Sequence, residues 1–145
     1  MARVLFILLI QTLAHDNRML RSSWRETLNK AKMANVGIWT LSVLTAALFL
    51  LSAIPKLTMP GWVGRFAAWG YPEWFLYVIA GLEIVGAIGL LVPRFAAHSA
   101  GLLIVIMFGA MYTHLTHDEG IWWNLAYLVC LTLIGWYRIK NNKST

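Results

Sequence analysis

The sequence is poor in cysteine and in charged residues. Cys130 is the single cysteine among 145 residues, so the chain cannot form an internal disulfide or a dithiol redox pair of its own. Charged residues make up 12% of the chain, whereas soluble domains carry roughly 25%. The sequence also has no phosphate-binding loop, nucleophile elbow, CxxC motif or zinc-protease motif. These absences argue against a soluble enzyme with a familiar catalytic motif.

Hydrophobic residues are abundant instead: they form 59% of the chain, and the mean hydropathy is +0.65. A helix needs about 20 mostly apolar residues to cross the hydrocarbon core of a bilayer. Four stretches approach that length, at residues 36–54, 74–92, 96–116 and 121–139. Eight tryptophans and five tyrosines suit a chain with two membrane interfaces. We therefore expect an all-α protein, a four-helix transmembrane bundle in the lipid bilayer of a bacterial or archaeal inner (cell) membrane.

The segment before the first apolar stretch is basic. In it Trp24 and Leu28 lie four residues apart, and so do Arg21 and Arg25, a spacing typical of an amphipathic helix at an anionic membrane surface. A solvated, disordered tail is the alternative. The predicted division of the chain is a cytoplasmic extension at 1–32, a four-span membrane domain at 33–140 and a basic tail at 141–145.

Lysine and arginine residues predict the orientation of the four spans. On one side they gather in residues 15–32, at Arg94 and in residues 138–143. The other side has only Lys56 and Arg65, together with the acidic pair Asp118 and Glu119. The positive-inside rule then places both termini in the cytoplasm. This distribution accounts for the formal net charge of +6, so we expect no nucleic-acid partner.

Three ionisable residues lie in or beside the apolar stretches: Lys56, Glu83 and His114. A carboxylate inside a span costs about 2.5–3.5 kcal/mol or more, so Glu83 should face protein or a water-filled cavity. Lys56 and His114 are expected near the outer helix ends, and Glu83 about 14 Å deeper than Trp74. Lys56 and Glu83 are thus expected at different depths in the membrane. Either a direct pair between them or a bridging water or ligand fits this difference. A pocket for a small ligand or quinone head group, a polar clamp that fixes helix register, and proton transfer through Glu83 or His114 all remain open.

The histidines give little support to a haem or a metal ion. His98 and His114 lie sixteen residues apart on one expected helix, about 24 Å along its axis, so they cannot ligate one iron from the same chain. His114 and His117 are three residues apart and precede Asp118 and Glu119, which makes them weak candidates for a divalent metal. A solvated helix end is the commoner meaning of such a cluster, and we expect no metal site.

Short motifs occur in a fixed order between residues 36 and 117. They are Ser52-Ala53-Ile54-Pro55-Lys56-Leu57, Gly70-Tyr71-Pro72, Gly81-Leu82-Glu83-Ile84, Gly89-Leu90-Leu91-Val92-Pro93 and Ala110-Met111-Tyr112-Thr113-His114. With this order and this hydropathy, the chain resembles the DoxX and DoxX-like family of small four-helix membrane proteins. Residues 1–32 lie outside the resemblance.

The resemblance implies a four-helix bundle in which Lys56, Glu83 and His114 are characteristic polar positions. The family name comes from a subunit linked to quinone-dependent sulfur oxidation, other members are associated with membrane oxidoreductase complexes, and distant relatives act as membrane chaperones. We predict a subunit or accessory of a quinone-linked membrane oxidoreductase system, with partner subunits or a second copy of the chain. Its small polar pocket would centre on Glu83, with Lys56 compensating its charge and His114 donating to a carbonyl oxygen.

The alternative is a non-catalytic membrane scaffold or assembly factor that binds partner helices. The small-residue faces expected for such contacts are Gly81, Gly86 and Gly89 in one span and Gly101 and Gly109 in the next. A small-solute transporter is a weaker third interpretation, because four short helices enclose little volume unless the protein dimerises.

The predicted orientation can be tested with two reporters fused to the C-terminus, one active only in the periplasm and one active only in the cytoplasm. We expect activity from the cytoplasmic reporter alone, because an even number of spans returns the chain to the side of its basic N-terminus. A periplasmic C-terminus would contradict the four-span arrangement.

Overall fold

The computed structural model of the chain describes the backbone of residues 2–142 and the side chains of residues 19–141. Over that range the structure has five helices and no strand, which confirms the all-α prediction. The helices are α1 (Ala2–Thr58), α2 (Gly61–Ala68), α3 (Glu73–Leu91), α4 (Ala96–Thr116) and α5 (Trp122–Asn142). The chain divides into two compact units, Met1–Gly37 and Ile38–Thr145.

The first unit is the N-terminal part of α1. Its backbone is helical from Ala2. All side chains from residue 19 to residue 37 are exposed. A position on an anionic membrane surface stays a prediction. The side chains of residues 1–18, and residues 143–145 of the predicted basic tail, lie outside the described part of the chain.

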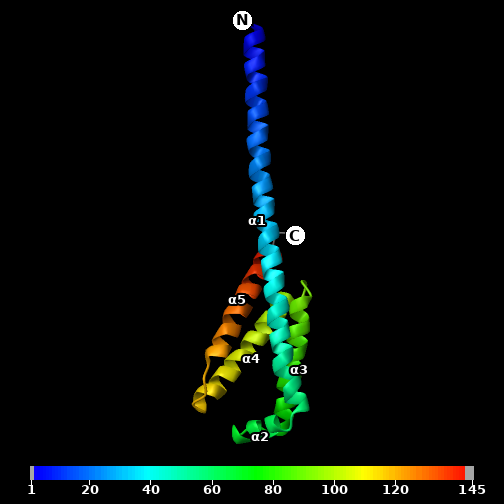
Figure 1. Cartoon of the computed structure of the whole chain (residues 1–145), viewed down its shortest axis with the longest axis vertical. Coiled ribbons are helices and arrows are strands. Elements are labelled where there is room, and N and C mark those ends of the chain that lie inside the picture. The colour runs from blue at the N-terminus through cyan, green and yellow to red at the C-terminus, as the bar shows by residue number, and fades with distance from the viewer. Residues whose placement is uncertain (1, 143–145) are drawn as a thin grey trace. The chain divides into compact units, whose positions relative to one another are not determined.

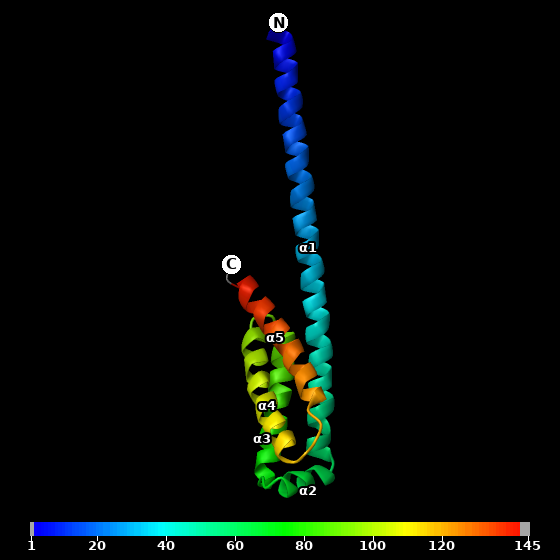
Figure 2. The ribbon, with the colours of Figure 1, turned by 90° about the vertical axis from the view of Figure 1, so that its left-hand side faces the viewer.

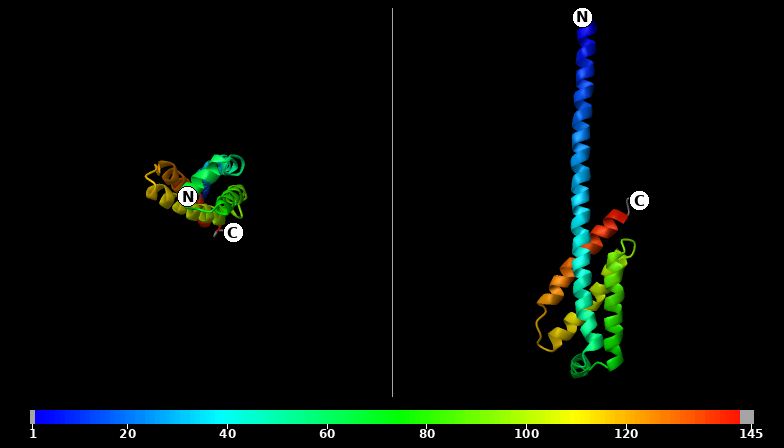
Figure 3. Two further views of the ribbon diagram at one scale, coloured as in Figure 1. Left: turned by 90° about the horizontal axis from the view of Figure 1, so that it is seen from below. Right: turned by 45° about the vertical axis from the view of Figure 1, so that its right-hand side comes forward.

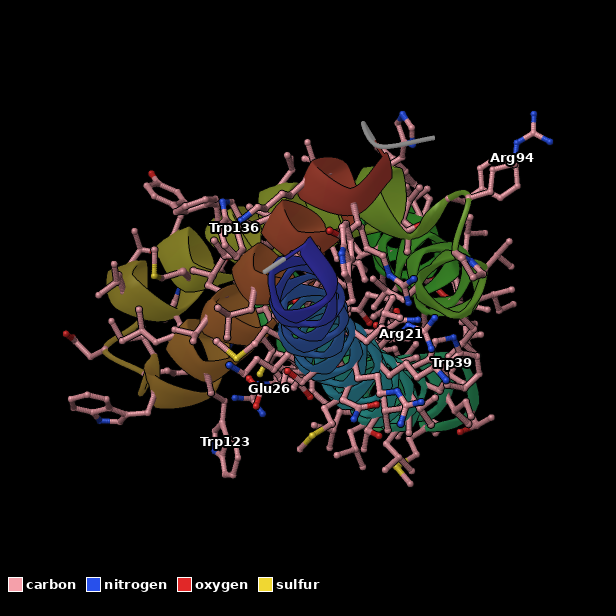
Figure 4. The ribbon with its side chains drawn as sticks, turned by 90° about the horizontal axis from the view of Figure 1, so that it is seen from above. Arg21, Glu26, Trp39, Arg94, Trp123 and Trp136 are labelled. Carbon is pink, nitrogen blue, oxygen red and sulfur yellow. The ribbon has the colours of Figure 1, made fainter. Side chains whose placement is uncertain are left out.

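The second unit is a helical bundle with α2 across one of its ends (Figures 1 and 2). The α4–α5 loop lies at the same end as α2, and the α3–α4 turn lies at the opposite end, as Figure 3 also shows. Arg94 points away from the bundle at that turn (Figure 4). The core combines residues of α1, α3, α4 and α5: Ala46, Phe49, Ala87, Leu90, Ala100, Leu103, Ile106, Met107, Leu131 and Ile134.

Three helices contain segments long and apolar enough to cross a membrane, within the part of the chain that the structure describes: Met19–Thr58, Glu73–Leu91 and Ala96–Thr116. The bundle also turns many large apolar side chains outward, Val85 and Val105 among them. A surface of this kind is unfavourable in water and suits lipid. α5 has a comparable length, but Asn124, Arg138 and Lys140 reduce its apolar character, so the fourth predicted span stays a prediction.

Trp62, Phe66 and Trp69 are spaced four and three residues apart, which predicts a short interfacial helix with its aromatic residues in the headgroup layer. The segment is helical, as α2, but Phe66 is buried in the bundle. There it contacts Trp69 and Tyr71, with ring centroids 5.3 and 6.1 Å away. α2 therefore packs partly inward, against the start of α3.

Two glycines of α3 allow close packing against α4. A Cβ atom on Gly86 would lie 2.6 Å from Cδ2 of the buried Leu103, and one on Gly89 would overlap the hydroxyl of Ser99. A Cβ on Gly81, by contrast, meets no atom within 4 Å. Gly86 and Gly89, predicted as part of a face for partner helices, are thus used inside the bundle.

We predict that Gly86→Ala lowers the free energy of unfolding by about 1–3 kcal/mol relative to Gly81→Ala, because an added methyl group in a tightly packed core displaces its neighbours. Both changes add the same methyl group to the interior of α3, so helix propensity cancels in the comparison. Reversible unfolding of the purified variants in detergent micelles measures the difference. Equal stability of the two variants would contradict the packing seen between α3 and α4.

Candidate functional site

The centre of the bundle contains a direct ion pair between Lys56 and Glu83. The ammonium Nζ of Lys56 lies 2.6 Å from Oε2 and 2.7 Å from Oε1 of Glu83. It also donates to the hydroxyl of Ser52 over 3.1 Å. Ser52 and Lys56 are four residues apart and therefore share one face of α1. Each of the three ammonium protons of Lys56 thus has an acceptor on the protein.

The pair is almost completely removed from the surface, with Lys56 8% and Glu83 2% exposed. Isolated charges at such depth are expensive, and a mutual contact with further hydrogen bonds compensates that cost. The sequence left open either a direct pair or a bridging molecule. The structure has the direct pair, which joins the end of α1 to the middle of α3.

A cavity of about 630 Å³ adjoins the pair and is lined by residues from α1 to α5. Ligand pockets for small molecules have volumes of about 300–1,000 Å³ and mainly apolar walls with few polar groups. The wall nearest α2 and the start of α3 is aromatic, formed by Trp62, Phe66, Trp69, Tyr71 and Phe75. The cavity therefore has the size and the lining of a small-molecule site.

His114 lines the same cavity but belongs to a second ionic cluster. Its Nδ1 lies 2.6 Å from Oε2 of Glu119, and Nη2 of Arg65 lies 2.9 Å from the same oxygen. A carboxylate only accepts, so Nδ1 of His114 carries the proton and Nε2 is left for another partner. Trp69 packs edge-on against His114 at 5.6 Å and faces the Arg65 guanidinium at 5.0 Å.

The environment of Glu119 favours its charged form. Desolvation raises the pKa of this carboxyl, but the hydrogen bonds and charges of Arg65 and His114 together lower the pKa further than desolvation raises it. The net effect is a pKa below the ordinary value of 4.5. Glu119 is therefore a carboxylate at neutral pH, and its contacts connect the α4–α5 loop to α2 and to the end of α4.

The remaining polar residues on the wall are Tyr71, Thr113 and Asn124. The hydroxyl of Thr113 donates to the carbonyl of Gly109 over 3.1 Å, so the hydroxyl of Tyr71, 2.8 Å away, donates to Thr113. Asn124 is buried near the start of α5. Tyr127, one turn further on, lines the same cavity and packs on Phe49 with ring centroids 4.8 Å apart.

The structure thus brings Lys56, Glu83 and His114 to one cavity but not into one cluster. Sequence reasoning missed that Arg65 and Glu119 hold His114. The only available signal was an acidic residue shortly after His114 and an arginine in the preceding loop on the same predicted side.

The weak metal candidates have other partners for their Nδ1 atoms. Nδ1 of His117 donates to the carbonyl of Thr113 over 2.8 Å, and Nδ1 of His114 bonds to Glu119. Within residues 19–141 the structure contains no group of three or more His, Cys, Asp or Glu side chains placed to hold a metal ion.

We predict that removing one partner of the central pair, as Lys56→Met or Glu83→Leu, lowers the free energy of unfolding by about 3–5 kcal/mol, because an uncompensated charge stays buried. The double variant should recover most of that loss, since neither charge is then present. A double-mutant cycle of unfolding measurements in detergent gives the coupling between the two residues. Additive losses would show that the two side chains do not stabilise each other.

Comparison with known proteins identifies a family. The uncharacterised protein YdgD of Bacillus subtilis (strain 168) is 36% identical over 80 residues, which cover 52% of this chain and 70% of that protein. No solved structure matches the chain. The model of the DoxX-like family matches residues 40–136, a range that contains the ion pair, all of α2 and most of α5. The chain therefore belongs to the DoxX-like family.

Proposed function

We propose that the cavity binds a small molecule with an apolar ring and a polar end, such as a quinone head group. We further propose that the protein is a subunit or accessory of a quinone-linked membrane oxidoreductase system. The observation that supports this proposal is a cavity of about 630 Å³ with aromatic walls and a buried Lys56–Glu83 pair at its side. Aromatic faces suit a flat ring, and a few polar groups suffice to orient it.

The chain offers defined roles for its polar residues in such a site. Glu83 retains lone pairs beyond those that accept from Lys56, so it can accept a further hydrogen bond or a proton. Lys56 keeps the charge of Glu83 compensated throughout. Glu119 accepts from Nδ1, so Nε2 of the neutral His114 ring can accept from a ring hydroxyl, and donation from Nε2 to a carbonyl oxygen requires the protonated ring. The sequence has no cofactor motif of its own, which favours an accessory over a complete enzyme.

We also propose that both termini face the cytoplasm, as the basic residues predict. In that orientation α2 and the α4–α5 loop face the outer side of the membrane. The aromatic residues of α2 that line the cavity would then cover it from that side. A ligand would enter from the outer leaflet or from the space beyond it.

A membrane scaffold that binds a partner helix is the second candidate. Gly101 and Gly109 of α4 leave open space where a Cβ would stand, and Val105 between them is 69% exposed. Such a surface permits close approach of another helix. The double variant Lys56→Met/Glu83→Leu separates the two candidates, because it removes both charges together and should leave partner binding intact while it removes a proton-linked activity of the cavity.

We predict that a soluble ubiquinone or menaquinone analogue raises the Tm of the purified protein by several degrees. Ligand at a hundred times its Kd stabilises the folded state by about 2.7 kcal/mol. Ala110→Trp, which fills the cavity, should abolish the shift. Phe108→Trp, which adds an indole on the outer face of α4, should preserve it. No quinone in an organic extract of the purified protein, together with no change in Tm, would contradict the proposal.

A further inference from the structure

Asn124 differs from every other buried polar side chain on the cavity wall. The other three are Lys56, Glu83 and Thr113, and each of them is hydrogen-bonded within the protein. Asn124 is only 7% exposed, yet its amide has no hydrogen bond to any residue that the structure describes. An amide in a largely buried position that lacks a partner in the protein is unfavourable, so native proteins rarely leave one unused. The amide of Asn124 is therefore free to bind a molecule inside the cavity.

The charged side chains around the cavity are all paired with one another. Lys56 and Glu83 cancel, and Arg65 and Glu119 cancel while the His114 ring is neutral. No formal charge is left over for an ion in the cavity. A charged ligand would lose its hydration without gaining an opposite charge, which is strongly unfavourable in a buried site. An uncharged ligand carries no such penalty.

We propose that the cavity selects uncharged ligands and that Asn124 fixes their polar end; this inference rests on the ligand cavity proposed above. A carboxamide offers two N–H donors and one carbonyl acceptor. Its NH₂ group can donate to a ring carbonyl, and its oxygen can accept from a ring hydroxyl. Asn124 therefore suits a cyclic ketone and also the corresponding alcohol or phenol, which are the oxidised and reduced forms of a quinone-like compound.

The test compares two probes with the same ring and different charge, measured by equilibrium dialysis against the purified protein in lipid nanodiscs. Dimethylnaphthoquinone is uncharged, and naphthoquinone sulfonate is an anion. We expect the wild-type protein to bind the uncharged probe at least tenfold more tightly. Glu83→Gln leaves the positive charge of Lys56 uncompensated, and the protein that remains folded should bind the anionic probe more tightly relative to the uncharged probe. An unchanged ratio of the two Kd values would contradict selection by charge balance.

Asn124→Leu tests the role of the amide, because it removes the polar group and changes the volume of the side chain little. We expect the Kd for dimethylnaphthoquinone to rise about tenfold, the effect of losing one well-placed hydrogen bond. The Tm of the unliganded variant should stay the same or rise, because an amide without a partner in the protein is replaced by an apolar group. Asn29→Leu makes the same chemical change at an exposed position outside the cavity and should behave as wild type.

The outcomes distinguish failure of the proposed ligand cavity from failure of the proposed ligand selection within it. If the wild-type protein binds neither probe, the ligand cavity itself is wrong. If it binds both probes equally, selection against charge is wrong and the cavity stands. If Asn124→Leu binds the uncharged probe as the wild type does, the role of Asn124 is wrong and the cavity stands. A marked fall in the Tm of unliganded Asn124→Leu would assign the amide a structural contact and would also overturn its role toward a ligand.

Discussion

The bundle depends on the buried contact between Lys56 and Glu83. Two charges at this depth are tolerable only while they remain together, so the last turns of α1 and the middle of α3 must keep one relative register. Ser52 takes the third proton of the ammonium and leaves Lys56 without an unused donor. An interaction with this geometry fixes the relative position of the two helices, and the surrounding helices cover both side chains except where they border the cavity.

α3 packs closely against α4 toward its C-terminal end and borders a cavity toward its N-terminal end. Gly86 and Gly89 let α4 approach α3 where a larger residue would overlap Leu103 or Ser99. Toward the end of the bundle that α2 crosses, the residues between the helices are large and aromatic, and they enclose a cavity instead of a filled core. The Arg65–Glu119–His114 cluster connects α2 to the α4–α5 loop and to α4 at this end.

The charges, the lining and the free amide of this cavity together favour one kind of ligand. The Lys56–Glu83 pair is balanced, and so is the Arg65–Glu119–His114 cluster while the His114 ring is neutral. The lining is mostly aromatic and apolar, and Asn124 is its buried polar group without a partner among the described residues. A flat, uncharged molecule with an oxygen at one end satisfies all three features. The family assignment does not by itself specify a ligand, so the proposal rests on these features of the cavity.

The sequence by itself determined the all-α class, the limits of α3 and α4 to within one residue, the family, and Lys56 and Glu83 as charges in or beside apolar stretches. These follow from composition, from apolar runs and from short motifs in a fixed order, which are properties of local segments. The start of α1 at Ala2 was not predicted, because the segment before residue 36 is not an apolar run. Only the tertiary structure decided that Lys56 touches Glu83, that Arg65 and Glu119 hold His114, that Gly86 and Gly89 face α4, and that Asn124 has no partner. Contacts such as Arg65–Glu119 join residues 54 positions apart, and no local periodicity encodes which distant side chain will complete a pair.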